Sequence, residues 1–148
     1  MRIDDRTEQH VRDTLHWVVK RDADKFDAGL KSFPNAAARE AALALVVAVS
    51  GFVLIDLHGG RPTPQQVAVL SEEIGRMEAW ASVTADEAAS FMNAVVEGRP
   101  LNEQLAPQDV VVLGFVVAGS LLSARPLPEG EWWFNYLDKV EAAIEAAG

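Results

Sequence analysis

The sequence predicts an all-α fold, a bundle of six to seven helices around two apolar central helices. Three observations predict it. Apolar residues recur at helical spacing, capping and stop residues divide the chain into helix-length segments, and no segment alternates with the period of two typical of a strand. Because the chain has 148 residues and no cysteine, we expect one domain, residues 1–148, without disulfides or thiolate metal sites.

The opening segment predicts one or two amphipathic helices. Asp4 or Asp5 can cap the first helix, with Glu8 at the capping-box position relative to Asp5. Residues 22–32 continue the helical spacing and are either a second helix or an extension of the first. Pro34 ends this part, because the residue before a proline disfavours helical geometry.

The first central helix is predicted to run from Asn35, as its cap, to about His58, with Gly59 and Gly60 as a left-handed stop. Its stretch 41–55 contains no charged residue. This run is shorter than the roughly 20 residues that a bilayer core requires. We therefore expect a buried core helix, apolar on every face because neighbours surround it.

Two amphipathic helices are predicted next. Thr63 caps the first, which runs to about Trp80, and Thr84 caps the second, which ends before Gly98. In each helix, a glutamine or glutamate three residues after the threonine completes a capping box. An irregular or 3₁₀ passage is expected over residues 101–106.

The second central helix is predicted to start at Pro107, because proline is favoured at the first helical position. Its stretch 110–124 is a second run without charge, which we also expect to be buried. The last helix is predicted to begin near Pro128. Its apolar face has five members: Trp133, Tyr136, Leu137, Val140 and Ile144.

The net charge of the chain is −9, from 22 acidic and 13 basic residues. Residues 1–40 hold eight of each sign, so the negative excess lies after Glu40. Nucleic-acid binding needs Lys and Arg against the phosphates, so we expect no direct binding of DNA or RNA. The first residues lack the basic stretch and apolar run of a secretory signal, which predicts a cytoplasmic protein that does not engage a membrane.

Similar residues follow both central helices. Arg61-Pro62 and Arg125-Pro126 lie 64 residues apart, and each pair precedes an amphipathic helix. The chain is therefore either a degenerate duplication of one helical unit or a coincidence of ordinary helix stops, since Arg99-Pro100 carries the same pair.

Part of the first half resembles the tellurite-resistance TerB-like helical family. The resemblance lies in three stretches: Ala41–Ser50, Asp56–Gly60 and Thr63–Gln66. It implies a seven-helix bundle associated with stress response, which acts by binding partners and holds a divalent metal at acidic turn residues. Departing from the family pattern, Gln65-Gln66 stand where glutamates are expected, and Ser123-Ala124 replace the second acidic residue and glycine.

Asp56 and His58 are the candidate metal ligands. They lie at the end of the first central helix and offer an oxygen and an imidazole nitrogen, suitable for a divalent metal or a general-base pair. Their spacing points them about 200 degrees apart on a regular helix. The alternative is that Asp56 pairs with an arginine such as Arg61, while His58 favourably occupies the helix C-terminus.

Trp132, Phe134 and Trp80 are the candidate partner-binding residues, because they fall at the edge of their apolar stripes or outside them. Either a neighbouring segment covers these aromatic side chains, or they anchor a protein partner or a second copy of the chain.

We expect a non-catalytic helical module for protein interaction or regulation. A role in stress response is what the TerB-like resemblance implies. The sequence contains no nucleophile motif, phosphate loop or zinc-hydrolase motif, so no enzyme activity is predicted. Two alternatives stay open. One is a TerB-like protein that binds a divalent metal or small ligand, and the other is an acidic antitoxin, immunity or decoy protein that masks a basic partner.

Overall fold

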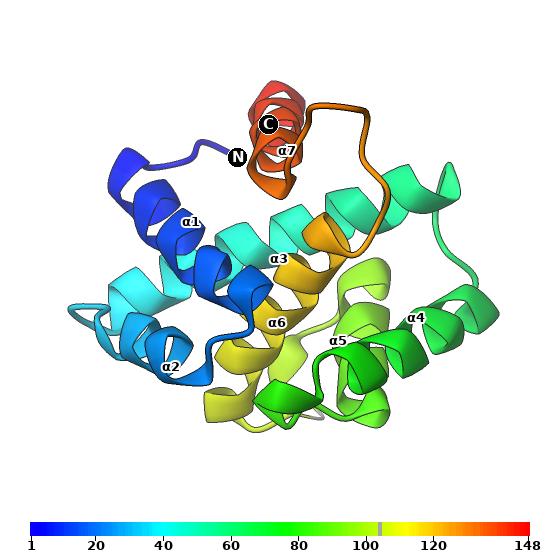
Figure 1. Cartoon of the computed structure of the whole chain (residues 1–148), viewed down its shortest axis with the longest axis horizontal. Helices are drawn as coiled ribbons and strands as arrows, with labels where there is room; N and C mark the ends of the chain where they lie inside the picture. Colours follow the sequence, from blue (N-terminus) through cyan, green and yellow to red (C-terminus); the bar gives the residue numbers. More distant parts are fainter. Residues whose placement is uncertain (104) are drawn as a thin grey trace.

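A computed structural model describes residues 1–103 and 105–148, and confirms the all-α prediction: these residues form helices and no strand. Gln104, inside the predicted 101–106 passage, lies outside the described residues. Two 3₁₀ segments, η1 (Ala79–Ala81) and η2 (Leu101–Glu103), accompany seven α-helices (Figure 1). The α-helices are α1 (Asp5–Lys20), α2 (Ala23–Lys31), α3 (Ala36–His58), α4 (Pro64–Met77), α5 (Ala85–Glu97), α6 (Pro107–Ser123) and α7 (Trp133–Ala147).

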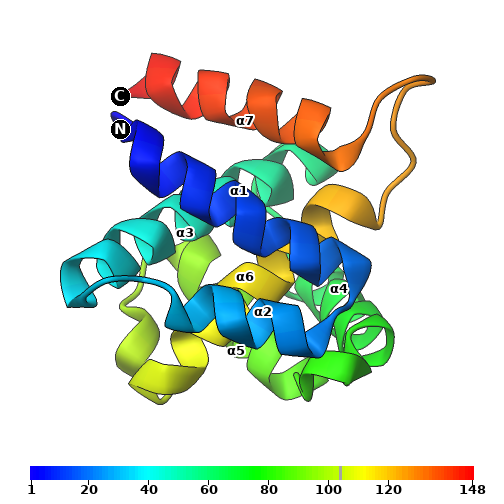
Figure 2. The ribbon, with the colours of Figure 1, turned by 60° about the vertical axis from the view of Figure 1, so that its left-hand side comes forward.

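Helix α6 lies at the centre of the bundle. It packs against α1, α3, α5 and α7, and Figure 2 shows it behind α1 and α2. Every residue from 113 to 122 is buried. This enclosure explains why the helix carries no charge after its first turn, since an unpaired buried charge is costly.

Helix α3 is central but only partly enclosed, which corrects the expectation that 41–55 is hidden on every face. One face is buried against other helices, and Val46 and Val49 on it are fully covered. Ala41 and Ala44 are exposed, and Ile55 is 54% exposed. Its neighbours α1, α5, α6 and α7 leave one side open to solvent, where Ala41 and Ala44 have little apolar surface to expose.

By length and composition α3 is also the one described helix that could cross a bilayer, with a mean hydropathy of 2.1 over its most apolar window. A core helix passes the same test. Here 39% of that window is buried, through packing against α1, α5, α6 and α7.

The predicted helix starts are confirmed at four positions, of which one is Pro107, the first residue of α6. Asn35, Thr63 and Thr84 each accept a hydrogen bond from a backbone N–H three residues later, and both threonines complete their capping boxes. The first helix is capped by Asp4, not Asp5, through Thr7 N at 3.0 Å. Residues 22–32 form a separate helix, because Arg21 adopts a left-handed conformation (φ 54°) that ends α1.

Two predicted boundaries are wrong. Helix α4 ends at Met77 instead of near Trp80, where the chain tightens into η1 and the side chain of Glu78 turns into the core. Helix α7 begins at Trp133 instead of near Pro128. Pro128 starts a turn, in which Glu131 N donates to Pro128 O at 3.0 Å and Gly130 has a φ of 82°.

Helix α7 lies along the outside of the bundle, where it packs on α3 and α6 (Figure 1). Three buried side chains attach it: Leu137, Val140 and Ile144. A loop over residues 124–132 separates it from α6, whereas Arg61-Pro62 lead almost directly into α4. The two halves therefore differ at the positions that suggested a duplication, which stays a prediction.

The contact between α1 and α6 depends on Gly119. A Cβ atom at this position would lie 2.5 Å from Val18 Cγ1. We expect Gly119→Ala to lower the free energy of unfolding by about 1–3 kcal/mol in urea denaturation, because the side chain overfills a packed core. Adding Val18→Ala should recover part of the loss.

Gly51→Ala on α3 is the matched control. Its Cβ would meet only Val95 Cγ1 at 3.3 Å, so the gain in helix propensity offsets a mild contact. Equal stability of the Gly119 and Gly51 variants would contradict the close approach of α1 to α6.

Candidate functional site

Trp132 and Phe134 form an exposed aromatic corner at the start of α7. Their exposed fractions are 66% and 41%, among the largest of the apolar side chains described. They are exposed because the stripe that attaches α7 runs through Leu137 and Val140, and neither residue shares it. The predicted covering of these two side chains by a neighbouring segment is therefore incomplete.

The backbone of the aromatic corner is held in place. Asn135 Oδ1 accepts from Trp132 N at 2.8 Å, which fixes the first turn of α7. The rings of Trp133 and Phe134 meet edge to face, with centroids 5.9 Å apart. Trp133 is half-buried against the core. The aromatic corner is thus a preorganised surface and not part of a flexible loop.

Acidic residues lie close to this corner in the sequence. Glu129 is exposed three residues before Trp132, and Asp138 lies one turn after Phe134 with its side chain 61% exposed. Lys139, the nearest cation in sequence, pairs with Glu131 at 2.5 Å. Arg12 of α1 pairs with Asp138 at 2.7 Å, but it shares its charge with two further carboxyl groups, so the surface keeps a local excess of negative charge.

One arginine of α1 connects to the aromatic corner. Arg12 Nη1 donates to the backbone carbonyl of Phe134 at 3.4 Å, a long hydrogen bond. Its other nitrogens bind carboxylates: Nε donates to Glu8 Oε1 at 2.6 Å, and Nη2 donates to Asp138 Oδ1 at 2.7 Å and Glu141 Oε1 at 3.1 Å. We name these residues the Arg12 cluster: Glu8, Arg12, Asp138 and Glu141.

Glu141 is the buried member of the Arg12 cluster, with 8% of its surface exposed. Its Oε2 atom is buried without a hydrogen-bond partner. Burial, and then the negative charge of Glu8, raise the pKa of Glu141 to about 7, although Arg12 acts in the opposite direction. This carboxyl group therefore exchanges its proton near neutral pH.

The candidate metal ligands have other partners in this structure. Asp56 Oδ2 accepts from the Tyr136 hydroxyl at 2.6 Å, so Asp56 pairs with a tyrosine of α7 and not with an arginine such as Arg61. Burial and the adjacent Asp56 raise the pKa of Tyr136, which keeps this hydroxyl a donor. His58 Nδ1 lies 2.6 Å from Leu54 O, at the helix C-terminus as the alternative interpretation expected.

Among the described residues no group of three or more His, Asp or Glu side chains is arranged to hold a metal ion. Asp56 is exposed and His58 half-buried. Asp56 and His58 therefore stay a predicted pair of ligands that lacks a third protein donor in the part of the chain described.

Trp80, the third candidate partner-binding residue, is half-buried and faces inward. Its ring packs edge to face on Phe26, with centroids 5.7 Å apart, and its Nε1–H donates to Glu78 Oε1 at 2.8 Å. Glu78 is 2% exposed and also accepts from Arg21 Nη2 at 3.2 Å and Ser120 Oγ at 3.3 Å. This network joins the end of α1 to α6 across η1.

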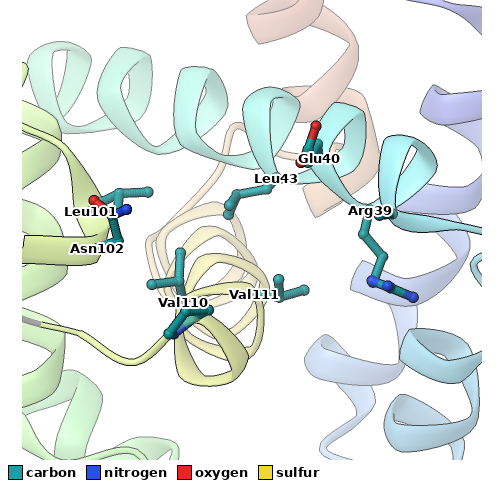
Figure 3. Close-up of a pocket in the computed structure, with 9 residues that line it drawn as sticks. Arg39, Glu40, Leu43, Leu101, Asn102, Val110 and Val111 are labelled. Carbon is teal, nitrogen blue, oxygen red and sulfur yellow. The ribbon is translucent and has the colours of Figure 1, made fainter.

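An apolar groove of about 480 Å³ lies between the first half of α3 and the start of α6. Leu43 of α3 points toward Val110 and Val111 of α6, while Arg39 and Glu40 stand at its rim (Figure 3). Its two charged rim residues have opposite signs. The groove therefore offers a small apolar surface without a net charge preference.

The sequence interpretation missed Glu78, Glu141 and Arg12. A signal for the first two is present: Glu78 follows Ile74 by four residues, and Glu141 follows Leu137 by four, so each acid stands on an apolar stripe. An acid at such a position needs a buried partner. The identity of that partner, Arg21 or Arg12, depends on tertiary packing of α1 and has no local signal.

Glu78→Ala is expected to lower the free energy of unfolding by about 2–4 kcal/mol, because it leaves a cavity and removes the acceptor of Trp80 Nε1–H. Glu72→Ala on the exposed face of α4 should change it by less than about 0.5 kcal/mol. Urea denaturation of both variants checks this. A Glu78 variant as stable as the Glu72 variant would contradict the network.

For the metal site, calorimetry with calcium, magnesium, manganese and zinc is the direct measurement. If Asp56 and His58 bind a metal, wild-type protein should release heat that Asp56→Ala abolishes, and the metal should raise the melting temperature. The same titration of Glu72→Ala controls for surface acids. Absence of heat in the wild type would exclude the pair as ligands for these ions.

Comparison of the chain with protein-family models, with curated proteins and with solved structures gives no match in any of the three. The resemblance to the TerB-like family therefore stays a prediction.

Proposed function

We propose that this chain is a non-catalytic interaction module that binds a protein through the aromatic corner. The observation that carries the proposal is the exposure of Trp132 and Phe134 on a helix start whose backbone is fixed. Large aromatic side chains dominate binding energy at protein interfaces. A preorganised aromatic surface also loses little conformational entropy when a partner binds.

The partner that fits this surface presents apolar side chains next to Lys or Arg. Glu129 is exposed three residues before Trp132, the Arg12 cluster next to Phe134 holds three carboxyl groups against one guanidinium, and the chain as a whole has a net charge of −9. Cations are attracted both to these carboxylates and to the faces of aromatic rings. The proposal thus joins the interaction module with the alternative in which an acidic protein covers a basic partner.

A photo-crosslinking amino acid in place of Trp132 tests the proposal in cells. Val69, 62% exposed on α4, is the matched control position. We expect a crosslinked protein from position 132 and not from position 69. Trp132→Ala and Phe134→Ala should each weaken binding of the purified partner by about 30-fold, the loss typical of a hot spot, while Val69→Ala binds as wild type.

Three further readouts complete this test. Binding should weaken as salt is added, since charges contribute to it. The melting temperature of the Trp132 variant should stay at the wild-type value, because the side chain is exposed. Sedimentation of the free chain measures whether it dimerises, and a dimer would identify a second copy of the chain as the partner. A monomer that crosslinks equally from positions 132 and 69 would contradict the proposal.

A further inference from the structure

Helix α7 reaches α1 through polar contacts of the Arg12 cluster. Its apolar attachments are made to α3 and α6 instead. Arg12 is also the residue that bonds to the carbonyl of Phe134, inside the aromatic corner. A change in how Arg12 shares its N–H groups therefore acts directly on the position of that corner.

The Arg12 cluster contains more acidic groups than basic ones. Three carboxyl groups share one guanidinium, and Glu141 is the least exposed of the three. Carboxylates that bind one guanidinium lie near one another, and like charges so placed disfavour simultaneous ionisation, particularly in a site removed from water. One carboxyl group of the cluster is therefore better accommodated in its neutral form.

Geometry identifies Glu141 as that group. Its Oε2 atom is enclosed without a partner, whereas Glu8 and Asp138 each bond to Arg12 at 2.7 Å or less and Asp138 reaches solvent. A proton on Glu141 removes its charge and adds a donor beside Glu8. Loss of that proton leaves a buried anionic oxygen, and Arg12 is the cluster's source of N–H groups that can satisfy it.

We propose that the Arg12 cluster is a proton-sensitive contact that sets the position of the aromatic corner. When Glu141 is neutral, Arg12 keeps its hydrogen bond to the Phe134 carbonyl. When Glu141 ionises, Arg12 turns toward Glu141 and gives up this long bond, so the first turn of α7 loosens from α1. The inference rests on the proposed function of the aromatic corner, and it adds pH as the signal that regulates it.

The charged groups that face Glu141 are those of the cluster. Helix α1 contributes Glu8 and Arg12, and α7 itself contributes Asp138. On α3 the carboxylate bonded to α7 is Asp56, which contacts Tyr136, while α6 carries its single charge, Asp109, in its first turn. Ionisation of Glu141 is thus controlled by residues of α1 and α7.

The direction of the pH effect follows from the pKa of Glu141, which rises from a usual 4.5 to about 7 in the folded chain. Because folding raises this pKa, neutral Glu141 stabilises the fold fully at a pH below 4.5. This stabilisation is lost as the pH rises through 7. The α1–α7 contact should therefore be closed in mild acid and loosened in mild base.

Nuclear magnetic resonance of the free chain between about pH 4 and about pH 9 tests the proposal. We expect the side-chain carboxyl carbon of Glu141 to titrate with a midpoint of about 7. The amide of Phe134 and the indole N–H of Trp132 should shift with that same midpoint. Glu141→Gln, which imitates the neutral acid, should abolish this transition at both reporters.

Glu145→Gln, an exposed acid on the same helix, is the matched control and should keep the transition. Asp138→Asn removes one negative charge from the cluster and should move the midpoint to lower pH. Titration of Glu141 at its usual value, reporters that stay still while Glu141 titrates, or a transition retained in Glu141→Gln would each overturn the proposal.

These outcomes are independent of any partner, so they are distinguishable from failure of the proposed function. Once the crosslinked partner is purified, its affinity should differ between about pH 6 and about pH 8 for wild type and not for Glu141→Gln. A pH transition at Phe134 without an effect of Trp132→Ala on binding would reject the interaction site and keep the proton-sensitive contact.

Discussion

The rest of the structure depends on the enclosure of α6. Residues 113–122 are buried without interruption, so every other helix that touches α6 must present an apolar face to it. Gly119 lets α1 approach closely, and buried Ser120 bonds to Glu78, which ties the end of α4 to the same centre. Helix α6 therefore links the ends of α1 and α4 to one shared apolar centre.

The other helices are less buried the farther they lie from α6. Helix α3 is exposed to solvent along one side. Helix α7 lies outside α3 and is attached by a single apolar stripe. Elements with few buried contacts open at lower free energy than the core. The same peripheral helix carries Trp132 and Phe134 and meets α1 through the ionisable Arg12 cluster. The proposed binding surface thus lies on a helix that we expect to open at lower free energy than α6.

Much of this fold is predictable from the sequence, because uncharged runs and capping boxes are local signals. The unequal burial of the two central helices was missed, because both carry an uncharged run of fifteen residues: within 41–55 the exposed positions are Ala41, Ala44 and the large Ile55, and α6 itself contains small residues such as Gly119. Of the candidate site, the exposure of Trp132 and Phe134 follows from their place off the stripe. Arg12 as the partner of Glu141 does not, because 129 residues separate them and only packing brings them together.

Native-state hydrogen exchange in increasing denaturant tests this ordering most directly, since it measures the opening free energy of each helix. The account predicts that amides of α6 exchange only through global unfolding, and that amides of α7 exchange through an opening of lower free energy that leaves α6 protected. Exchange of α6 and α7 in one cooperative step, or faster exchange of α6 than of α7, would contradict it.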